Sequence, residues 1–163
     1  MNAPFHTPAD PLEAPLWDLT DLYASREDPR IEADLERARA LVSELNALQG
    51  KLVGARAEPE VLGERLDRAV TLYEQASDVL GGLGAYAFLA ASTDRNDAAA
   101  QGFEATLREK GTTIAASTIW VTLEINQLEE AEIDAALAAA PGAARWRPWL
   151  RRVRAMKPHE LSH

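Results

Sequence analysis

Two histidines and a glutamate at the end of the sequence have the spacing of a zinc site. His159-Glu160-Leu161-Ser162-His163 fits the pattern H-E-x-x-H, in which two histidines one helical turn apart hold the metal and the glutamate polarises a bound water. Hydrolysis also requires a rigid helix and a third protein ligand. Pro158 can at best begin a helix, and no residue follows that could complete the turn. We therefore expect a turn at His159, a solvated chain end at His163 and no metal bound here.

Other residues that commonly carry out catalysis are scarce. The remaining histidine is His6, there is no cysteine, and no Gly-x-Ser-x-Gly, phosphate-binding glycine loop or dinucleotide fingerprint occurs. Asp94 and Asp97 share one turn, but no glutamate follows at calcium-loop spacing, so we expect them to cap helices. The prediction is that this chain has no catalytic residue, no cofactor-binding residue and no metal ligand.

A basic run without any acid lies near the end of the sequence. Its cations are Arg145, Arg147, Arg151, Arg152, Arg154 and Lys157. Two tryptophans lie among them, as in proteins that stack on single-stranded nucleic acid. However, Arg147, Arg151 and Arg154 have the spacing of one solvated helix face that pairs with acids elsewhere. Trp146, Leu150 and Val153 would form the buried side. The net charge of −9 also opposes nucleic acid and acidic membranes, so we expect neither as a partner.

Composition indicates one soluble domain. The 163 residues are 47% apolar and 26% charged, the balance of a globular protein. No apolar run reaches the roughly 18 residues of a membrane span, and the Pro-rich start lacks the basic and apolar regions of a signal peptide. Without cysteine nothing requires an oxidising compartment, so we expect a cytoplasmic location.

Apolar residues recur at helical spacing, and no segment alternates as a strand would. The fold class is therefore predicted to be all-α, with antiparallel helical hairpins or a bundle of about five helices and no sheet. Helices are expected from Asp28-Pro29 to Gly50, from Pro59 to about Ser92, from the Thr93–Asp97 turn to Leu128, from Glu129 to Ala140, and from Pro148 to Met156.

Three glycines interrupt the second of these helices, at Gly81, Gly82 and Gly84. An interior glycine costs about 1 kcal/mol relative to alanine, so they either break the helix or mark the close approach of another backbone. We expect close packing. Residues 17–23 are expected to form a strap capped by Thr20. Its Trp17, Leu22 and Tyr23, together with Tyr73, Tyr86 and Phe88, are expected in the core.

Four short motifs, in order, resemble the beginning of the oligoendopeptidase F family. They are Trp17–Tyr23, Gly50–Leu52, Tyr86–Leu89 before the Thr93-Asp94 turn, and Trp149–Arg154 followed by Lys157–Ser162. The last matches a helix followed by P-H-x-L-S in the non-catalytic region of the family, whose own H-E-x-x-H lies far downstream. At Ile119–Leu123 this chain departs from paired phenylalanines, and Glu124 keeps the acidic residue that follows them.

The resemblance implies a cytoplasmic zinc metallopeptidase that cleaves short peptides inside a deep channel. Residues 1–11 would be a flexible Pro-rich lead, and 12–163 the amino-terminal helical domain, truncated before the catalytic domain. That domain, absent here, would bind the zinc and supply the chemistry, and the helical domain would form a wall or gate of the channel. Its expected partners are the catalytic domain and short peptides, and this chain alone is expected to be inactive.

The alternative is a free-standing helical interaction module whose apolar stripes or basic carboxyl-terminal edge recruit a partner. The two hypotheses predict different surfaces, because a truncated half should expose a large apolar patch that its missing partner would cover.

Overall fold

The computed structural model describes residues 17–159, and within this range the chain is all-α without a strand. The helices are α1 Pro29–Asn46, α2 Lys51–Gly54, α3 Pro59–Thr93, α4 Ala98–Ala116, α5 Trp120–Gln127, α6 Glu130–Ala139, η1 Pro141–Trp146, α7 Arg147–Ala155 and η2 Lys157–His159. The predicted fold class is confirmed.

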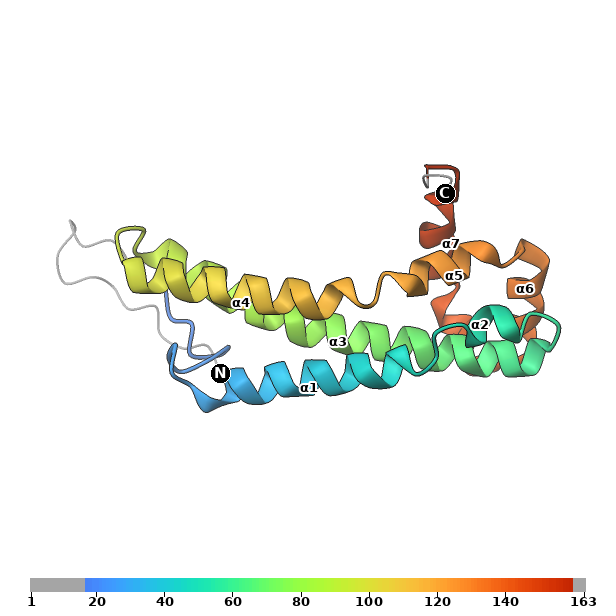
Figure 1. Cartoon of the computed structure of the whole chain (residues 1–163), viewed down its shortest axis with the longest axis horizontal. Helices are drawn as coiled ribbons and strands as arrows, with labels where there is room; N and C mark the ends of the chain where they lie inside the picture. The colour runs from blue at the N-terminus through green and yellow to red at the C-terminus, as the bar shows by residue number, and fades with distance from the viewer. Residues whose placement is uncertain (1–16, 160–163) are drawn as a thin grey trace, which may run out of the picture.

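The long helices α1, α3 and α4 lie side by side and alternate in direction along the length of the molecule (Figure 1). Helix α3 is central, because it packs against α1, α4 and α6. The short helices α2, α5, α6 and α7 gather around the beginning of α3. The molecule therefore has two ends with different constructions.

One end, called the strap end, is the three-helix part together with residues 17–28. Its buried residues are Tyr23, Ile31, Leu35, Ala38, Val42, Ala76, Leu83, Tyr86, Ala87, Leu107 and Ile114. The other end, called the α6 end, is formed by the start of α3 with the short helices around it. Its largest fully buried side chains are Leu45, Leu52, Leu62, Leu66, Leu72, Val121, Ile125, Leu128 and Leu150. Each buried leucine stabilises the fold by about 1.5–3 kcal/mol relative to exposure.

The α6 end contains the closest backbone approach at a glycine in the described chain. A Cβ placed on Gly63 of α3 would lie 2.5 Å from the Ala136 carbonyl oxygen and 2.5 Å from the Ala140 Cβ. Any side chain there would force α3 and α6 apart. The sequence analysis did not single out Gly63, because one glycine in a helical pattern has many explanations.

Two of the predicted helices are split. The first ends at Asn46 rather than Gly50, and after Gly50, which takes a left-handed conformation with φ of 78°, Lys51 begins a separate short helix, α2. The third is interrupted at residues 117–119. There the Ser117 and Thr118 hydroxyls each donate to a carbonyl three residues earlier, at 2.8 Å, which competes with helical bonding.

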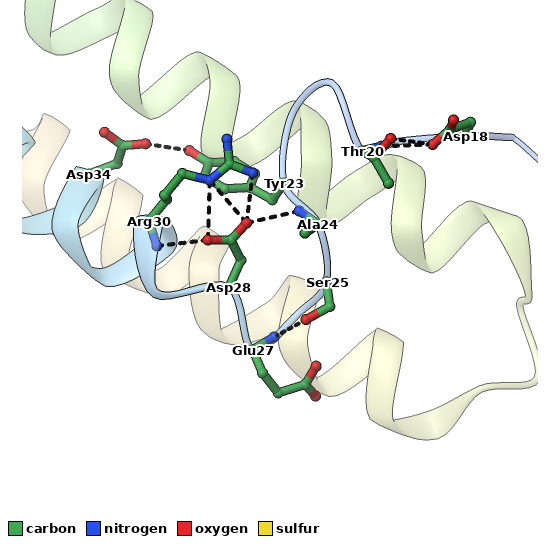
Figure 2. Close-up of polar contacts among 9 residues, drawn as sticks. All are labelled: Asp18, Thr20, Tyr23, Ala24, Ser25, Glu27, Asp28, Arg30 and Asp34. Atoms are coloured by element: carbon green, nitrogen blue, oxygen red, sulfur yellow. Dashed lines mark hydrogen bonds and ion pairs between the residues drawn. The ribbon is translucent and has the colours of Figure 1, made fainter.

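The strap holds its turn through Asp18 rather than Thr20. The Asp18 carboxylate accepts from the Thr20 backbone N–H at 3.0 Å and from its hydroxyl at 2.7 Å (Figure 2). Tyr23 is buried and donates its hydroxyl to Asp34 on α1 at 2.8 Å. Burial and this carboxylate raise the pKa of Tyr23 to about 12. Tyr23 thereby fixes the strap to the bundle, and Leu19 and Leu22 pack against the same core.

Two aromatic residues predicted to be in the core are exposed. Trp17 is 67% exposed and Phe88 is 58% exposed, so the prediction was wrong for both. Trp17 precedes the first turn of the strap, and Phe88 follows the buried Tyr86 and Ala87 on α3 but falls outside their buried stripe. Helical spacing alone does not show which aromatic residue falls outside the buried stripe.

Of the aspartates expected to cap helices, Asp28 and Asp97 do so, whereas Asp94 instead accepts from the Asn96 backbone N–H at 2.9 Å within the turn before α4. Asp28 accepts from the Arg30 backbone N–H at 2.9 Å, with Pro29 at the first helical position (Figure 2). The Arg30 guanidinium holds the pKa of the Asp28 carboxyl well below its usual range. Asp97 accepts from the N–H groups of Ala99 and Ala100 at the start of α4, and Arg26 pairs with it at 2.9 Å.

Within residues 17–159, no helix has the length and apolar character needed to cross a membrane. The predicted lead, His6 and residues 160–163 of the H-E-x-x-H pattern lie outside the described residues. The domain limits at residues 11 and 12 remain predictions.

Candidate functional site

An apolar groove of about 530 Å³ opens between α3 and α4 at the strap end. All of its lining residues except Leu35 belong to these two helices. The buried side chains of Leu35, Leu83 and Leu107 form its floor. Its volume is within the range of pockets that bind small ligands or peptide side chains.

Glycines create the open space in this groove. A Cβ placed on Gly81 or Gly84 of α3 would meet nothing within 4 Å, and one on Gly111 of α4 would meet only the Leu80 Cδ2 at 4.0 Å. The prediction that Gly81, Gly82 and Gly84 mark a close backbone approach is therefore wrong. Helix α3 remains continuous through them, and its neighbouring residues Leu83, Tyr86 and Ala87 are buried.

Polar groups border the groove on α4. The Arg108 guanidinium pairs with the Glu104 carboxylate at 3.2 Å, one helical turn apart. The exposed ring of Phe88 lies on the α3 side. An occupant would therefore bury apolar groups between the helices and place polar groups against a charged pair.

The apolar face continues beyond the groove toward the start of α5. A smaller cavity of about 200 Å³ shares Ser77, Leu80 and Ala115 with it and extends to Ile119 and Thr122. Ile119 is exposed. A strip of accessible apolar surface thus follows α3 and α4.

The basic run near the end of the chain is partly used to hold the α6 end together. Arg147 pairs with Asp134, and Arg154 pairs with Glu130 at 2.9 Å. Arg154 also donates to the Leu128 carbonyl at 2.6 Å, at the end of α5. The predicted pairing of this helix face with acids is confirmed for Arg147 and Arg154. Leu150 is buried as expected, and Trp146 and Val153 are half-buried against the same core.

Glu124 on α5 is the principal buried carboxylate at the α6 end. It accepts hydrogen bonds from the backbone N–H of Gly50 and, at 3.4 Å, from that of Val53. These groups lie at the start of α2, where N–H groups have no partner within the helix. A side chain more than 70 residues away in the sequence therefore caps this short helix.

No group of three histidine, aspartate, glutamate or cysteine side chains that could hold a metal occurs in residues 17–159. Asp97, one of the carboxylates considered above, is engaged as a helix cap. The side chain of His159 lies outside the described part, as do Glu160 and His163. The prediction that this motif binds no zinc remains a prediction.

Comparison with known families identifies part of the α6 end. Residues 124–163 match the peptidase M3 amino-terminal family model, described as Oligopeptidase F. The oligopeptidase F-like segment begins at Glu124, includes α6, η1 and α7, and covers about a quarter of the chain. The resemblance found in the sequence is confirmed over this segment, which is similar to the amino-terminal region of oligopeptidases.

Searches of curated proteins and of solved structures each found no match. The groove lies on α3 and α4, outside the oligopeptidase F-like segment. Its lining could have been suspected from the spacing of Ser77, Gly81, Gly84 and Phe88 on one face of α3. Gly111 on α4 carried no such signal, because only the packing of the two helices brings it to the same groove.

Proposed function

We propose that the chain is the amino-terminal, non-catalytic helical region of an oligopeptidase F-like zinc metalloendopeptidase. The α3–α4 groove would face the channel in which the complete enzyme hydrolyses short peptides, and would take up apolar parts of those peptides. The observation that carries the proposal is the family match at residues 124–163.

The match supports a role for the whole bundle because the matched segment is packed onto α3. Gly63 of α3 lies against Ala136 and Ala140 of the segment. The indole N–H of Trp146 donates to Asp67 of α3 at 2.7 Å, and Arg145 pairs with the same carboxylate at 3.2 Å. These contacts support the proposal that the long helices and the matched segment act together.

Zinc is proposed for the catalytic domain alone. The described residues do not fit a catalytic zinc site, because no three potential ligands gather and the buried Glu124 is engaged with backbone N–H groups. Residues 17–159 would position and enclose the peptide, and the metal-assisted cleavage would take place on the other domain.

The proposal is tested with two glycine-to-leucine variants in the complete enzyme that includes the zinc domain. Gly111→Leu fills the groove, whereas Gly102→Leu makes the same change on the same helix at an exposed position outside it. We expect Gly111→Leu to raise KM for short apolar peptides several-fold with little change in kcat, and Gly102→Leu to change neither. Equal KM values for both variants would refute the role of the groove.

The isolated 163-residue chain provides the complementary test. It is expected to hydrolyse no fluorogenic short peptide, with or without added zinc. Hydrolysis that a chelator abolishes would contradict the assignment of the chemistry to another domain.

A further inference from the structure

The basic run divides into two groups of cations with different surroundings. Arg145, Arg147 and Arg154 pair with acids of the bundle. Arg151 and Arg152 are exposed and make no ion pair with any residue between 17 and 159. Lys157, just after α7, is also exposed. The first group stabilises the fold, and the second is available to a partner.

The free cations lie on one face of α7. The exposed residues of this helix and its end are Pro148, Arg151, Arg152, Ala155 and Met156, and their spacing of three and four places them together. We call this set the basic face. The buried Leu150 is on the other side, and α7 projects from the long axis of the molecule (Figure 1). Met156 is among the most exposed large apolar side chains, so the face offers both charge and apolar contact.

The surroundings of the basic face favour a short acidic partner over a long polyanion. The chain as a whole carries −9, although the face itself is cationic. Glu130 and Asp134 on α6 lie beside α7, where Arg154 and Arg147 reach them, and both carboxylates are more than half exposed. A nucleic acid strand that continued past α7 would meet these acids and be repelled. A short segment with a few carboxylates would not extend so far.

We propose that the basic face of α7 binds an acidic polypeptide segment with an apolar side chain or two. The guanidinium groups of Arg151 and Arg152 would each take a carboxylate in a two-pronged contact, and Met156 would pack against the apolar side chain. The proposal rests on charge and exposure at α7, and it stands independently of the α3–α4 groove and of the peptidase function.

The test measures binding of a short fluorescein-labelled peptide of glutamate, alanine and leucine by fluorescence anisotropy at low salt. The control peptide has glutamine in place of every glutamate. The protein variant is Arg151→Gln/Arg152→Gln. Its matched control, Arg37→Gln/Arg95→Gln, removes the same charge from two exposed arginines that form no ion pair in the described chain and lie far from α7 in sequence.

We expect the wild-type chain to bind the acidic peptide and not the glutamine peptide. The α7 double variant should weaken binding about tenfold, as expected for the loss of two exposed charge pairs, and the matched control should change it less than twofold. Circular dichroism should show both variants to be folded, and Arg151→Lys/Arg152→Lys should retain part of the affinity. Equal binding by the two glutamine variants, or tighter binding of single-stranded DNA or anionic vesicles than of the peptide, would overturn the proposal.

Discussion

The two ends of this molecule share one helix but use glycine for opposite purposes. At the α6 end, Gly63 allows α6 to approach α3 so closely that a methyl group would not fit. At the strap end, Gly81 and Gly84 of the same helix face open space and leave a groove. The comparison shows that a helical glycine only leaves out a side chain. Whether another element fills the space decides between a tight helix contact and an open groove.

The ends also differ in how their polar groups are satisfied. At the α6 end, buried or half-buried groups such as Glu124 and Asp67 serve distant parts of the chain. At the strap end, polar contacts are mostly local, as in the Asp18 and Asp28 turns. We infer that the α6 end supplies stability and that the strap end remains accessible for binding.

The largest effect expected is that of Gly63→Ala, because the added methyl group would overlap the Ala136 carbonyl oxygen and the Ala140 Cβ. We predict a loss of about 3 kcal/mol in the free energy of unfolding, measured by urea denaturation. Gly102→Ala, at an exposed helical position with nothing near its Cβ, is the control and should be neutral or stabilising. If both variants had the same free energy of unfolding, α3 and α6 could not be packed as closely at Gly63 as the structure shows.

The next largest effect is expected for Glu124→Ala. The substitution leaves the N–H groups of Gly50 and Val53 without their acceptor, and the free energy of unfolding should fall by about 2 kcal/mol. Glu124→Gln keeps one oxygen acceptor and should lose less. Hydrogen exchange should show α2 opening first in the alanine variant. Unchanged exchange at Lys51–Gly54 would contradict the capping role.

Glycine substitutions in the groove should have the opposite sign. Gly81→Ala and Gly84→Ala should each raise the free energy of unfolding by up to about 1 kcal/mol, because alanine favours the helix and meets no neighbour. Thermal and urea unfolding would check this. A loss of stability at either position would mean that the groove is closed in solution.

The smallest effect concerns alkaline pH at the strap. The pKa of Tyr23 is raised to about 12 in the folded chain, above the tyrosine value of about 10 in the unfolded chain. The stability that this tyrosine contributes is fully present below pH 10 and is lost as the pH rises toward 12. Tyr23→Phe should therefore lessen the fall in unfolding free energy over this range. An identical pH profile for the variant would contradict the Tyr23–Asp34 contact.

Much of the fold could be predicted from the sequence because its signals are local. Asp28-Pro29 and Asp97 mark helix starts through bonds to residues two or three positions away, and the apolar stripes fixed the all-α class. The breaks after Asn46 and Ala116 were missed, because the apolar pattern continues across both. Hydroxyl groups that bond to preceding carbonyls are possible at many positions, so their presence at Ser117 did not predict a break.

The sequence could suggest the α3 side of the candidate groove, but the groove itself could not be predicted because it depends on contacts between helices. The sequence shows that Gly81 and Gly84 lack side chains, but not whether another helix fills the space. The same limit applies to Phe88, whose exposure is set by the rotation of α3 relative to its neighbours. By contrast, the oligopeptidase F resemblance could be recognised from short ordered motifs before any contact was known, and it is confirmed over residues 124–163.

The central claim is that the strap end presents an open groove for apolar parts of peptides, whereas at the α6 end the helices pack closely around Gly63. Calorimetric titration of the 163-residue chain with a short apolar peptide tests it most directly. The account predicts that wild type and Gly102→Leu bind alike and that Gly111→Leu, which fills the groove, weakens binding at least severalfold. Undiminished binding by a correctly folded Gly111→Leu variant would contradict it.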